Sequence, residues 1–206
     1  MTVPYDLQPY SLTDFDGETS LEDVDIEGLI PTFVATRGDL NTVEAENILR
    51  ASPWAVQQVE RLGSIGILQF GFFFELHKRM FCDVWDWAGS QRTREANLGS
   101  DPAQIVEDVK RTMDDAIYWH ENNTFDADGR AVRLHHRLVT VHPFRNGNGW
   151  CTRLIGDLYL MSVGSTPFTW GGGSAEIRPK YIDAVRAAPD DGYVALSALS
   201  RQPVPD

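Results

Sequence analysis

Apolar residues recur at a helical spacing along most of the chain. In residues 101–119 and 126–141, an apolar side chain returns every three or four positions. That period places the apolar side chains on one face of a helix, where they can pack against a core. Residues 152–161, 177–187 and 193–200 show the same period over shorter lengths. The pattern predicts an all-α fold.

The first predicted helices lie in residues 41–62. Asn41, followed three positions later by Glu44, is typical of a capping box at a helix start. Pro53 lacks an N–H group and should interrupt the helix, so we expect two consecutive helices here. Residues 65–81 are apolar nearly all round, which is typical of a helix buried in the middle of a core.

Two segments depart from the helical pattern. Residues 1–28 are rich in acidic side chains without sustained periodicity, which predicts an acidic N-terminal arm and leaves residues 29–206 as a single domain. Residues 91–98 have the length and polarity of an exposed β-hairpin. The expected fold is therefore a compact helical bundle that carries one small hairpin.

The composition fits one domain with a sizeable core. Of the 206 residues, 42% are hydrophobic, which is enough to bury a core in a chain of this length. The formal net charge of -12 argues against a general electrostatic grip on nucleic acid or on an anionic membrane, since both attract clustered Lys and Arg. We expect neither nucleic acid nor a membrane as a partner.

The N-terminus and the cysteines indicate the compartment. The first residues have neither the positive charge nor the apolar run of a signal peptide. Cys82 and Cys151 stand far apart and fit no metal-ligand spacing, so reduced thiols are the simplest interpretation. Both features favour a cytoplasmic protein.

Residues 142–153 contain the most distinctive motif. Gly147 and Gly149 bracket Asn148 at a predicted helix start, where the backbone can approach a ligand closely and direct unpaired N–H groups at an anion. Arg153 stands four residues after Gly149, one helical turn along on the same side, where its guanidinium could clamp a second phosphate. The spacing predicts a site for a di- or triphosphate.

His142 precedes this turn and is the candidate catalytic base. Pro143 and Phe144 follow it and should fix its backbone and anchor the segment in the core. An imidazole near neutrality can accept a hydroxyl proton, an effect typically of about 10²–10⁴ in rate. The alternative is a tight connection with a purely structural histidine. The combination of histidine, aromatic anchor, Gly-Asn-Gly and an in-phase arginine favours the catalytic interpretation.

At these residues the sequence resembles the Fic family, whose signature reads His-x-Phe-x-(Asp/Glu)-Gly-Asn-Gly-Arg-x-x-Arg. The likeness covers most of residues 40–165, and residues 28–31 and 36–41 are similar to the branch called mobile mystery protein B. Other segments that look like the family are residues 76–81, 85–89 and 134–139.

The resemblance implies transfer of AMP from ATP to a Ser, Thr or Tyr hydroxyl of a target protein. His142 would deprotonate the hydroxyl, Gly147, Asn148 and Gly149 would hold the phosphates, and Arg153 would bind the γ-phosphate. The predicted hairpin corresponds to the family's flap, which binds the target segment by strand addition. The flap residues would be Thr93, Arg94, Glu95, Ala96, Asn97 and Leu98.

Two positions depart from the family signature. Asn146 stands where the family has the acidic ligand of Mg²⁺, and an amide oxygen without charge is a weaker ligand. Trp150 replaces the first arginine, so one phosphate contact is missing. Two alternatives to AMP transfer therefore stay open. One is a catalytically impaired module that binds a nucleotide or a partner, and the other is a phosphotransferase like the related Doc proteins, which also have asparagine at the acidic position.

A second motif resembles a regulatory element of the family. Residues 42–47 match the pattern (Ser/Thr)-x-x-x-Glu-(Gly/Asn) of an inhibitory helix, which we place near residues 42–51. By that resemblance Glu46 pairs with Arg153 and competes with ATP for its guanidinium. The expected activity is autoinhibited protein AMP transfer that uses ATP and Mg²⁺, and a homo-oligomer is compatible with the sequence.

Overall fold

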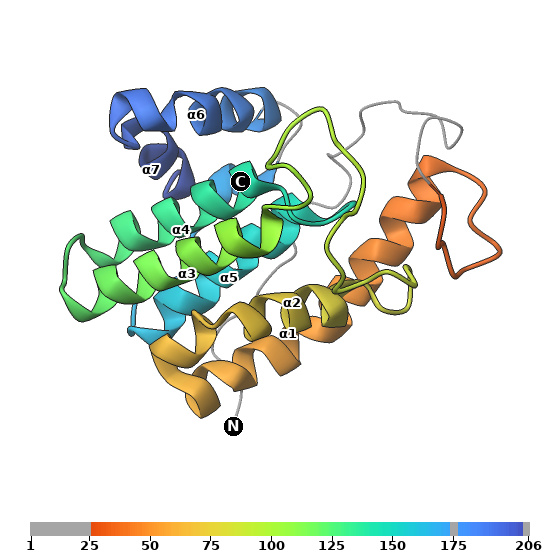
Figure 1. Ribbon diagram of the computed structural model, residues 1–206, viewed down its shortest axis with the longest axis horizontal. Coiled ribbons are helices and arrows are strands. Elements are labelled where there is room, and N and C mark those ends of the chain that lie inside the picture. Colours follow the sequence, from red (N-terminus) through yellow and green to blue (C-terminus); the bar gives the residue numbers. More distant parts are fainter. Residues whose placement is uncertain (1–25, 174–176, 204–206) are drawn as a thin grey trace.

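The computed structural model describes residues 26–173 and 177–203, which fold into seven α-helices and a short 3-10 helix (Figure 1). Within this described part there is no β-strand, only an isolated antiparallel bridge between Leu29 and Trp85. The predicted all-α class is confirmed. Most of the predicted acidic arm, residues 1–25, lies outside the described residues. None of the described helices is both long and apolar enough to cross a membrane.

Helix α1 (Arg37–Ile67) begins earlier and runs further than the sequence pattern predicted. Its capping box joins Thr36 and Asp39, so the expected cap at Asn41 is wrong. The predicted break at Pro53 is also wrong, because the helix continues through the proline. The Ser52 hydroxyl donates to the Ile48 carbonyl at 2.9 Å next to the missing N–H. The chain kinks instead at Gly63, where φ is 62°.

The centre of the molecule is formed by α2 (Phe70–Phe81) and α5 (Asn148–Ser162). Helix α5 packs against α1, α2 and α4 (Ala127–Val141), and every residue from Cys151 to Leu160 is buried. Helix α2 contributes Phe73, Leu76 and Met80, all fully buried, to the same core. The predicted central helix is therefore present, although residues 65–67 belong to α1.

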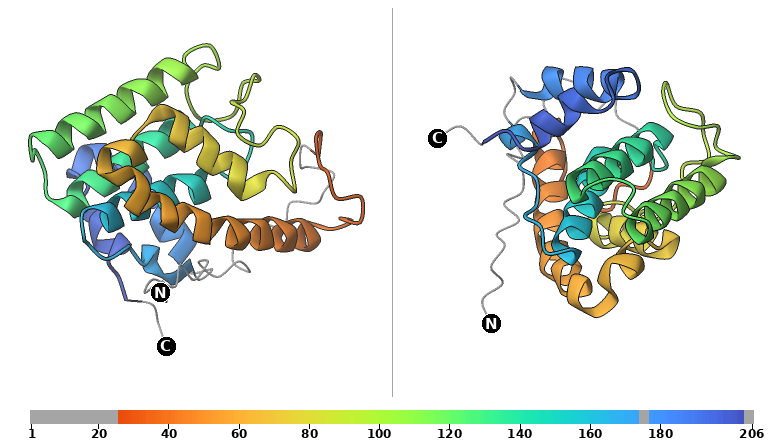
Figure 2. Two further views of the ribbon diagram at one scale, coloured as in Figure 1. Left: turned by 90° about the horizontal axis from the view of Figure 1, so that it is seen from below. Right: turned by 90° about the vertical axis from the view of Figure 1, so that its left-hand side faces the viewer.

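The remaining helices cover this centre. Helix α3 (Ile105–Glu121) packs on α4, and α6 (Ile177–Asp191) packs on α7 (Val194–Ser200) above α4 in Figure 1. The 3-10 helix η2 (Trp170–Gly173) contacts both α6 and α7. Figure 2 shows that the long connection between α2 and α3 extends from the bundle as a loop.

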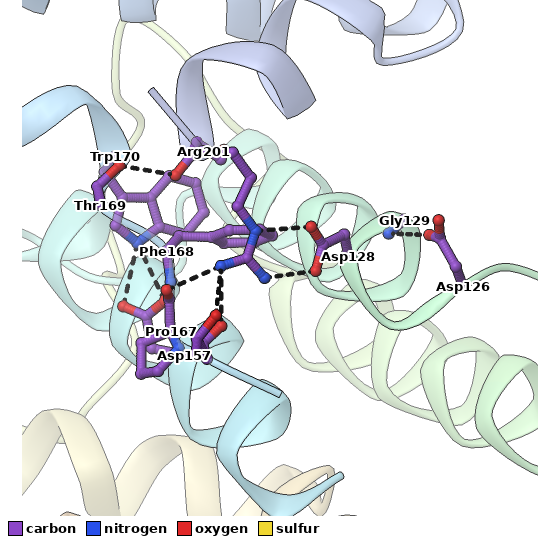
Figure 3. Close-up of polar contacts among 11 residues, drawn as sticks. Asp126, Asp128, Gly129, Asp157, Pro167, Phe168, Thr169, Trp170 and Arg201 are labelled. Carbon is purple, nitrogen blue, oxygen red and sulfur yellow. Dashed lines mark hydrogen bonds and ion pairs between the residues drawn. The ribbon is translucent and has the colours of Figure 1, made fainter. Parts of the chain in front are cut away.

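Two carboxylates, the buried Asp157 and the partly exposed Asp128, tie the C-terminal helices to the bundle (Figure 3). Asp157, fully buried in α5, accepts hydrogen bonds from the Phe168 backbone N–H at 3.0 Å and from the Trp170 indole N–H at 3.0 Å. Arg201, directly after α7, forms a two-pronged ion pair with Asp128 of α4. Such pairing offsets the large cost of removing a carboxylate from water. These contacts fix the position of the C-terminal helices, of which α6 contributes to the site described below.

The predicted hairpin does not form in residues 90–101, which are an irregular loop. The two sides of this loop do not pair with each other, because their backbone N–H groups form hydrogen bonds with the chain on either side of His142. The Arg92 N–H donates to the Pro143 carbonyl at 2.8 Å, and the Ser100 N–H donates to the Val141 carbonyl at 3.0 Å. The buried Arg92 guanidinium donates to the carbonyls of His142, Arg94 and Ser100, so it takes the place of inter-strand bonds.

Candidate functional site

The turn between α4 and α5 places His142 in an unusual backbone conformation. His142 ends α4 with φ 52° and ψ 59°, and its N–H donates to the Leu138 carbonyl at 3.1 Å. A non-glycine residue in this left-handed region is uncommon and is maintained only by its surroundings. Here the surroundings are the fully buried Phe144 ring and the Arg92 guanidinium. The strain therefore coincides with the predicted base.

Two cavities meet at His142. The first, which we call the arginine cavity, has a volume of about 240 Å³ and lies among α1, the turn, α5 and α6. The second, the loop cavity, has about 250 Å³ and lies under residues 92–96. Among the described residues, His142 and Arg145 alone line both. The arginine cavity is lined by Arg37, Asn41, Glu44, Ala45, Ile48, His142, Arg145, Asn146, Gly147, Asn148, Gly149, Trp150, Arg153 and Arg178.

The charge of the arginine cavity is opposite to that of the whole chain. Among the described residues, four arginines line it, one each from α1, the turn, α5 and α6, whereas the chain carries a net charge of -12. Clefts lined by one sign of charge concentrate ligands of the other sign. Arg37 and Arg178 were not predicted, because only tertiary packing brings α1 and α6 to the turn. The cavity suits a polyanion.

The start of α5 supplies backbone donors to this cavity. Gly147 is the N-cap with φ 75°, and no side chain caps the helix. A Cβ on Gly147 would lie 2.4 Å from the Phe81 ring, so only glycine fits. A Cβ on Gly149 would meet no atom within 4 Å, which is consistent with its place on the cavity wall. The uncapped helix start and the open space at Gly149 together form an anion cradle.

Asn148 contributes to the cradle by its backbone and not by its side chain. Its amide accepts from the Phe144 N–H at 2.9 Å and donates to the Phe144 carbonyl at 2.8 Å. The side chain is therefore used to close the turn, and it is 3% exposed. The predicted phosphate-binding role is left to the Asn148 backbone.

Arg153 lies on the cavity wall between aromatic rings. Its guanidinium carbon is 5.0 Å from the Trp150 ring centroid and 5.5 Å from that of Tyr181 in α6. The Tyr181 hydroxyl is 2.8 Å from Nε2 of His135. Cation–π contacts of this kind stabilise a buried guanidinium. Trp150 stands at the position of the first arginine in the Fic signature, and its ring thus stabilises Arg153, which stands at the position of the second.

His77 of α2 supports the turn and was not predicted from the sequence. Its Nδ1 accepts the Gly89 N–H at 3.0 Å, so the ring proton is on Nε2, which donates to the Asn146 carbonyl at 3.0 Å. The ring stacks on Phe144 at 3.7 Å. Burial lowers the pKa of His77 to about 3, so the ring is neutral. The sequence feature that could have identified His77 is a single histidine within a largely apolar helix.

The environment of His142 keeps its imidazole neutral at physiological pH. Burial lowers the pKa of His142 below its usual value, and the Arg92 charge acts in the same direction. The Val139 carbonyl acts in the opposite direction. A neutral imidazole can accept a proton, which is the protonation state that a general base requires.

The structure places Glu44, and not Glu46, in the arginine cavity. Glu46 is exposed on α1, and among the described residues it makes no ion pair with Arg153, so the expected contact is absent from this conformation. Glu44 Oε1 accepts from the Trp85 indole N–H and from the Asn146 amide, each at 2.7 Å. Burial raises the pKa of Glu44, against the effect of these hydrogen bonds and of the Arg37 charge. Glu44 stands seven residues, two helical turns, after Arg37, which was a signal that the sequence offered.

The loop cavity contains part of the predicted flap. Thr93, Arg94, Glu95 and Ala96 line it, whereas Asn97 and Leu98 do not. Glu27 also lines it, and its carboxylate pairs with Arg94 at 2.9 Å and with Arg145 at 3.2 Å. The segment before α1 is thereby tied to the loop and to the turn.

This combination of turn, cradle and base agrees with a comparison of the chain with known families. Residues 68–160 match the model described as the Fic/DOC family. This part of the chain is a Fic domain. Its solved neighbours include a signalling protein of Bacteroides thetaiotaomicron that contains a Fic domain, with a TM-score of 0.60 at 17% identity over 74% of this chain and 63% of that chain.

Curated relatives of the Fic domain are named as adenylyltransferases. The protein adenylyltransferase fic-1 of Caenorhabditis elegans is 34% identical over 119 residues, which are 55% of this chain and 23% of the worm protein. A probable protein adenylyltransferase of Aquifex aeolicus is 28% identical over 107 residues, which are 52% of this chain and 31% of that protein. The chain thus matches less than a third of the length of these relatives.

One solved neighbour of the Fic domain contains a nucleotide. The BepC protein of Bartonella tribocorum, with bound AMPPNP, has a TM-score of 0.63 at 15% identity, over 82% of this chain and 87% of that chain. At this identity the likeness shows a shared fold. No comparison tests the resemblance to the mobile mystery protein B branch, which stays a prediction.

Proposed function

We propose that the chain transfers AMP from ATP to a Ser, Thr or Tyr hydroxyl of a target protein. The observation that carries the proposal is the position of His142, where the arginine cavity and the loop cavity meet. A base between a polyanion site and a second groove can act on a hydroxyl offered from one side and a phosphate offered from the other. The names of the relatives and the nucleotide in the Bartonella structure support the same activity.

In the proposed reaction the target hydroxyl oxygen attacks the α-phosphorus of ATP. Its proton passes to His142, the new P–O bond forms, and the bond to the β-phosphate oxygen breaks, so that pyrophosphate leaves with the electron pair. The backbone of Gly147, Asn148 and Gly149 would hold the phosphates, and Arg153 would bind the γ-phosphate. Mg²⁺ bound at Asn146 would neutralise charge on the departing pyrophosphate.

The target segment would occupy the loop cavity. Residues 93–96 offer backbone groups there, and the loop takes part in no strand pairing of its own among the described residues. An extended segment can therefore add to it by main-chain hydrogen bonds, which demand little of the target sequence.

Labelling with ATP tests the proposal. The full chain is incubated with ATP labelled at the α-phosphate, Mg²⁺ or Mn²⁺, and a lysate, beside the same reaction with ATP labelled at the γ-phosphate. AMP transfer gives protein label only from the α-phosphate, and His142→Ala lowers it at least about 10²-fold. His120→Ala, at the far end of α3, is the matched control. Label from the γ-phosphate alone would instead favour the Doc-like phosphotransferase.

The non-catalytic alternative rests on Asn146 and Trp150. It predicts no label with any variant, together with measurable binding of ATP or ADP by calorimetry. The packing of Trp150 against Arg153 argues against this alternative. Although Trp150 replaces the first arginine of the Fic signature, its ring stabilises Arg153, the residue proposed to bind the γ-phosphate.

Autoinhibition by Glu46 stays a prediction. Residues advance by about 100° around a helix, so Glu46 lies roughly 200° from Glu44 on α1 and faces away from the cavity. Inhibition by Glu46 therefore needs a rotation of the first turns of α1. Glu46→Gly raises labelling if such a conformation is populated. Equal labelling by Glu46→Gly and the unaltered chain would exclude this form of control.

A further inference from the structure

Glu44 is a buried carboxylate in a cavity that otherwise attracts anions. Among the described residues that line the arginine cavity, Glu44 is the acidic one, beside four arginines. Its Oε1 is 2.7 Å from the Asn146 amide nitrogen, at the edge of the cradle formed by Gly147 and Gly149. A carboxylate in this place repels the phosphates that the rest of the cavity attracts.

A cation between the carboxylate and the phosphates removes this conflict. Mg²⁺ in proteins is usually held by one or two side chains together with the phosphates of a substrate and water. The described residues contain no group of three or more His, Cys, Asp or Glu side chains that could hold a metal by themselves. A site with few protein ligands that is completed by phosphates fits this cavity.

The spacing of Glu44 and Asn146 fits adjacent positions of an octahedron. At the Mg–O distance of about 2.1 Å, two neighbouring ligands are about 3.0 Å apart. The Glu44 and Asn146 side-chain atoms are 2.7 Å apart, with the amide nitrogen towards the carboxylate. A half-turn of the amide exchanges nitrogen for oxygen with little movement of the chain, because the two ends have nearly the same shape. Both side chains then offer oxygen to one ion.

We propose that Glu44 and Asn146 together form a divalent-cation site on the wall of the arginine cavity. Glu44 supplies from α1 the negative charge that Asn146 lacks, and phosphate oxygens and water complete the coordination. The Trp85 indole, which donates to Glu44 at 2.7 Å, keeps the carboxylate aimed at Asn146. The inference rests on the proposed function for the nucleotide, since it needs phosphates in the cradle.

Manganese binding by the full chain tests the proposal without the transfer reaction. Mn²⁺ is titrated in the presence of a non-hydrolysable ATP analogue, and bound and free metal are separated by electron paramagnetic resonance. Glu44→Gln keeps the size of the side chain and one acceptor oxygen and removes its charge. We expect it to weaken Mn²⁺ binding by at least about tenfold, since even outer ligands of a metal cost that much. Glu60→Gln, exposed on the same helix, is the matched control and should bind as the unaltered chain does.

Unchanged Mn²⁺ affinity in Glu44→Gln would overturn the site. If that variant also bound the analogue more tightly without metal, Glu44 would instead be an inhibitor of nucleotide binding. Asn146→Asp provides a second variant if Glu44→Gln fails to fold, and it should tighten Mn²⁺ binding. Unchanged or weaker binding by Asn146→Asp would contradict the site.

The controls separate this proposal from the proposed function. His142→Ala should retain Mn²⁺ and analogue binding, because His142 is not a ligand in the proposed site. Absence of AMP transfer in the unaltered chain, with the Glu44-dependent Mn²⁺ binding present, would overturn the function and leave the cation site standing. Equal Mn²⁺ binding by Glu44→Gln and the unaltered chain, with AMP transfer present, would overturn the cation site and leave the function standing.

Discussion

At the scale of single residues, the turn contains two glycines with different roles. Gly147 is required by its φ of 75° and by the Phe81 ring, whereas Gly149 faces open space. A methyl group on Gly149 would thus enter the cradle without a clash in the empty protein.

We predict that Gly149→Ala lowers the affinity for ATP by about tenfold or more and leaves the free energy of unfolding unchanged or slightly higher. Alanine is up to about 1 kcal/mol better than glycine within a helix, so no loss of stability is expected. Calorimetry of ATP binding and denaturant unfolding measure the two effects. Gly71→Ala, on α2 and also without an atom within 4 Å, is the control and should leave ATP affinity unchanged. Equal ATP affinity in Gly149→Ala would place the phosphates elsewhere.

The pH dependence of labelling should reflect His142. Its pKa is lowered from 6.5, so the neutral base is present above the lowered value and is lost as the pH falls through it. We predict that the acid limb of kcat/KM has its midpoint below pH 6.5. A midpoint above pH 6.5 would show that another group, or a different His142 environment, controls the rate.

The residues missed at this scale share one property. His77, Glu44, Arg178 and Tyr181 come to the turn from other helices, so the motif of residues 142–153 contains none of them. His142, Gly147, Gly149 and Arg153 could be proposed from sequence because their spacing within twelve positions is itself the signal. The structure brings these four into one cavity.

At the scale of elements, amphipathic helices were predictable and irregular segments were not. The apolar period located α4, α5, α6 and α7 to within a few residues, because burial of one face decides their structure. The break expected at Pro53 failed because packing of α1 outweighs one missing hydrogen bond. The prediction of a hairpin was wrong because the buried Arg92 guanidinium donates hydrogen bonds to backbone carbonyls of the loop and of His142.

Arg92 should therefore be the main support of the loop between α2 and α3. We predict that Arg92→Lys lowers the free energy of unfolding by about 1–3 kcal/mol, since an ammonium cannot reach the same carbonyls and leaves one or more unpaired. Chemical denaturation measures the change. Arg94→Lys, with a largely exposed side chain, should change stability by less than about 1 kcal/mol. Equal effects of the two substitutions would show that Arg92 does not have this role.

At the scale of the whole molecule, the site is larger than the matched Fic domain. Residues 68–160 contain the turn and its base, but α1 supplies Arg37 and Glu44, and α6 supplies Arg178 and Tyr181. The arginines gather in one cavity of an acidic chain. This distribution could not be predicted from composition, which records charge without position.

The stability of the whole molecule should depend on the neutral state of His77. Its pKa is about 3 in the fold against 6.5 in the unfolded chain, so its contribution is complete above pH 6.5 and is lost as the pH falls towards 3. Each proton contributes a slope of about 1.4 kcal/mol per pH unit. We predict that His77→Gln, which retains a donor and an acceptor, loses less stability than the unaltered chain between pH 6 and 4, as measured by denaturant unfolding. A slope equal to that of the unaltered chain, with His120→Gln as control, would contradict this account.

The proposed role of His142 as the base in transfer of AMP to protein hydroxyls is tested by the protein label from ATP labelled at the α-phosphate. The label is compared between the unaltered chain and His142→Ala. We expect label in the unaltered chain and a loss of at least about 10²-fold in His142→Ala, with ATP binding retained. Equal label in both, under conditions where both bind ATP, would contradict it.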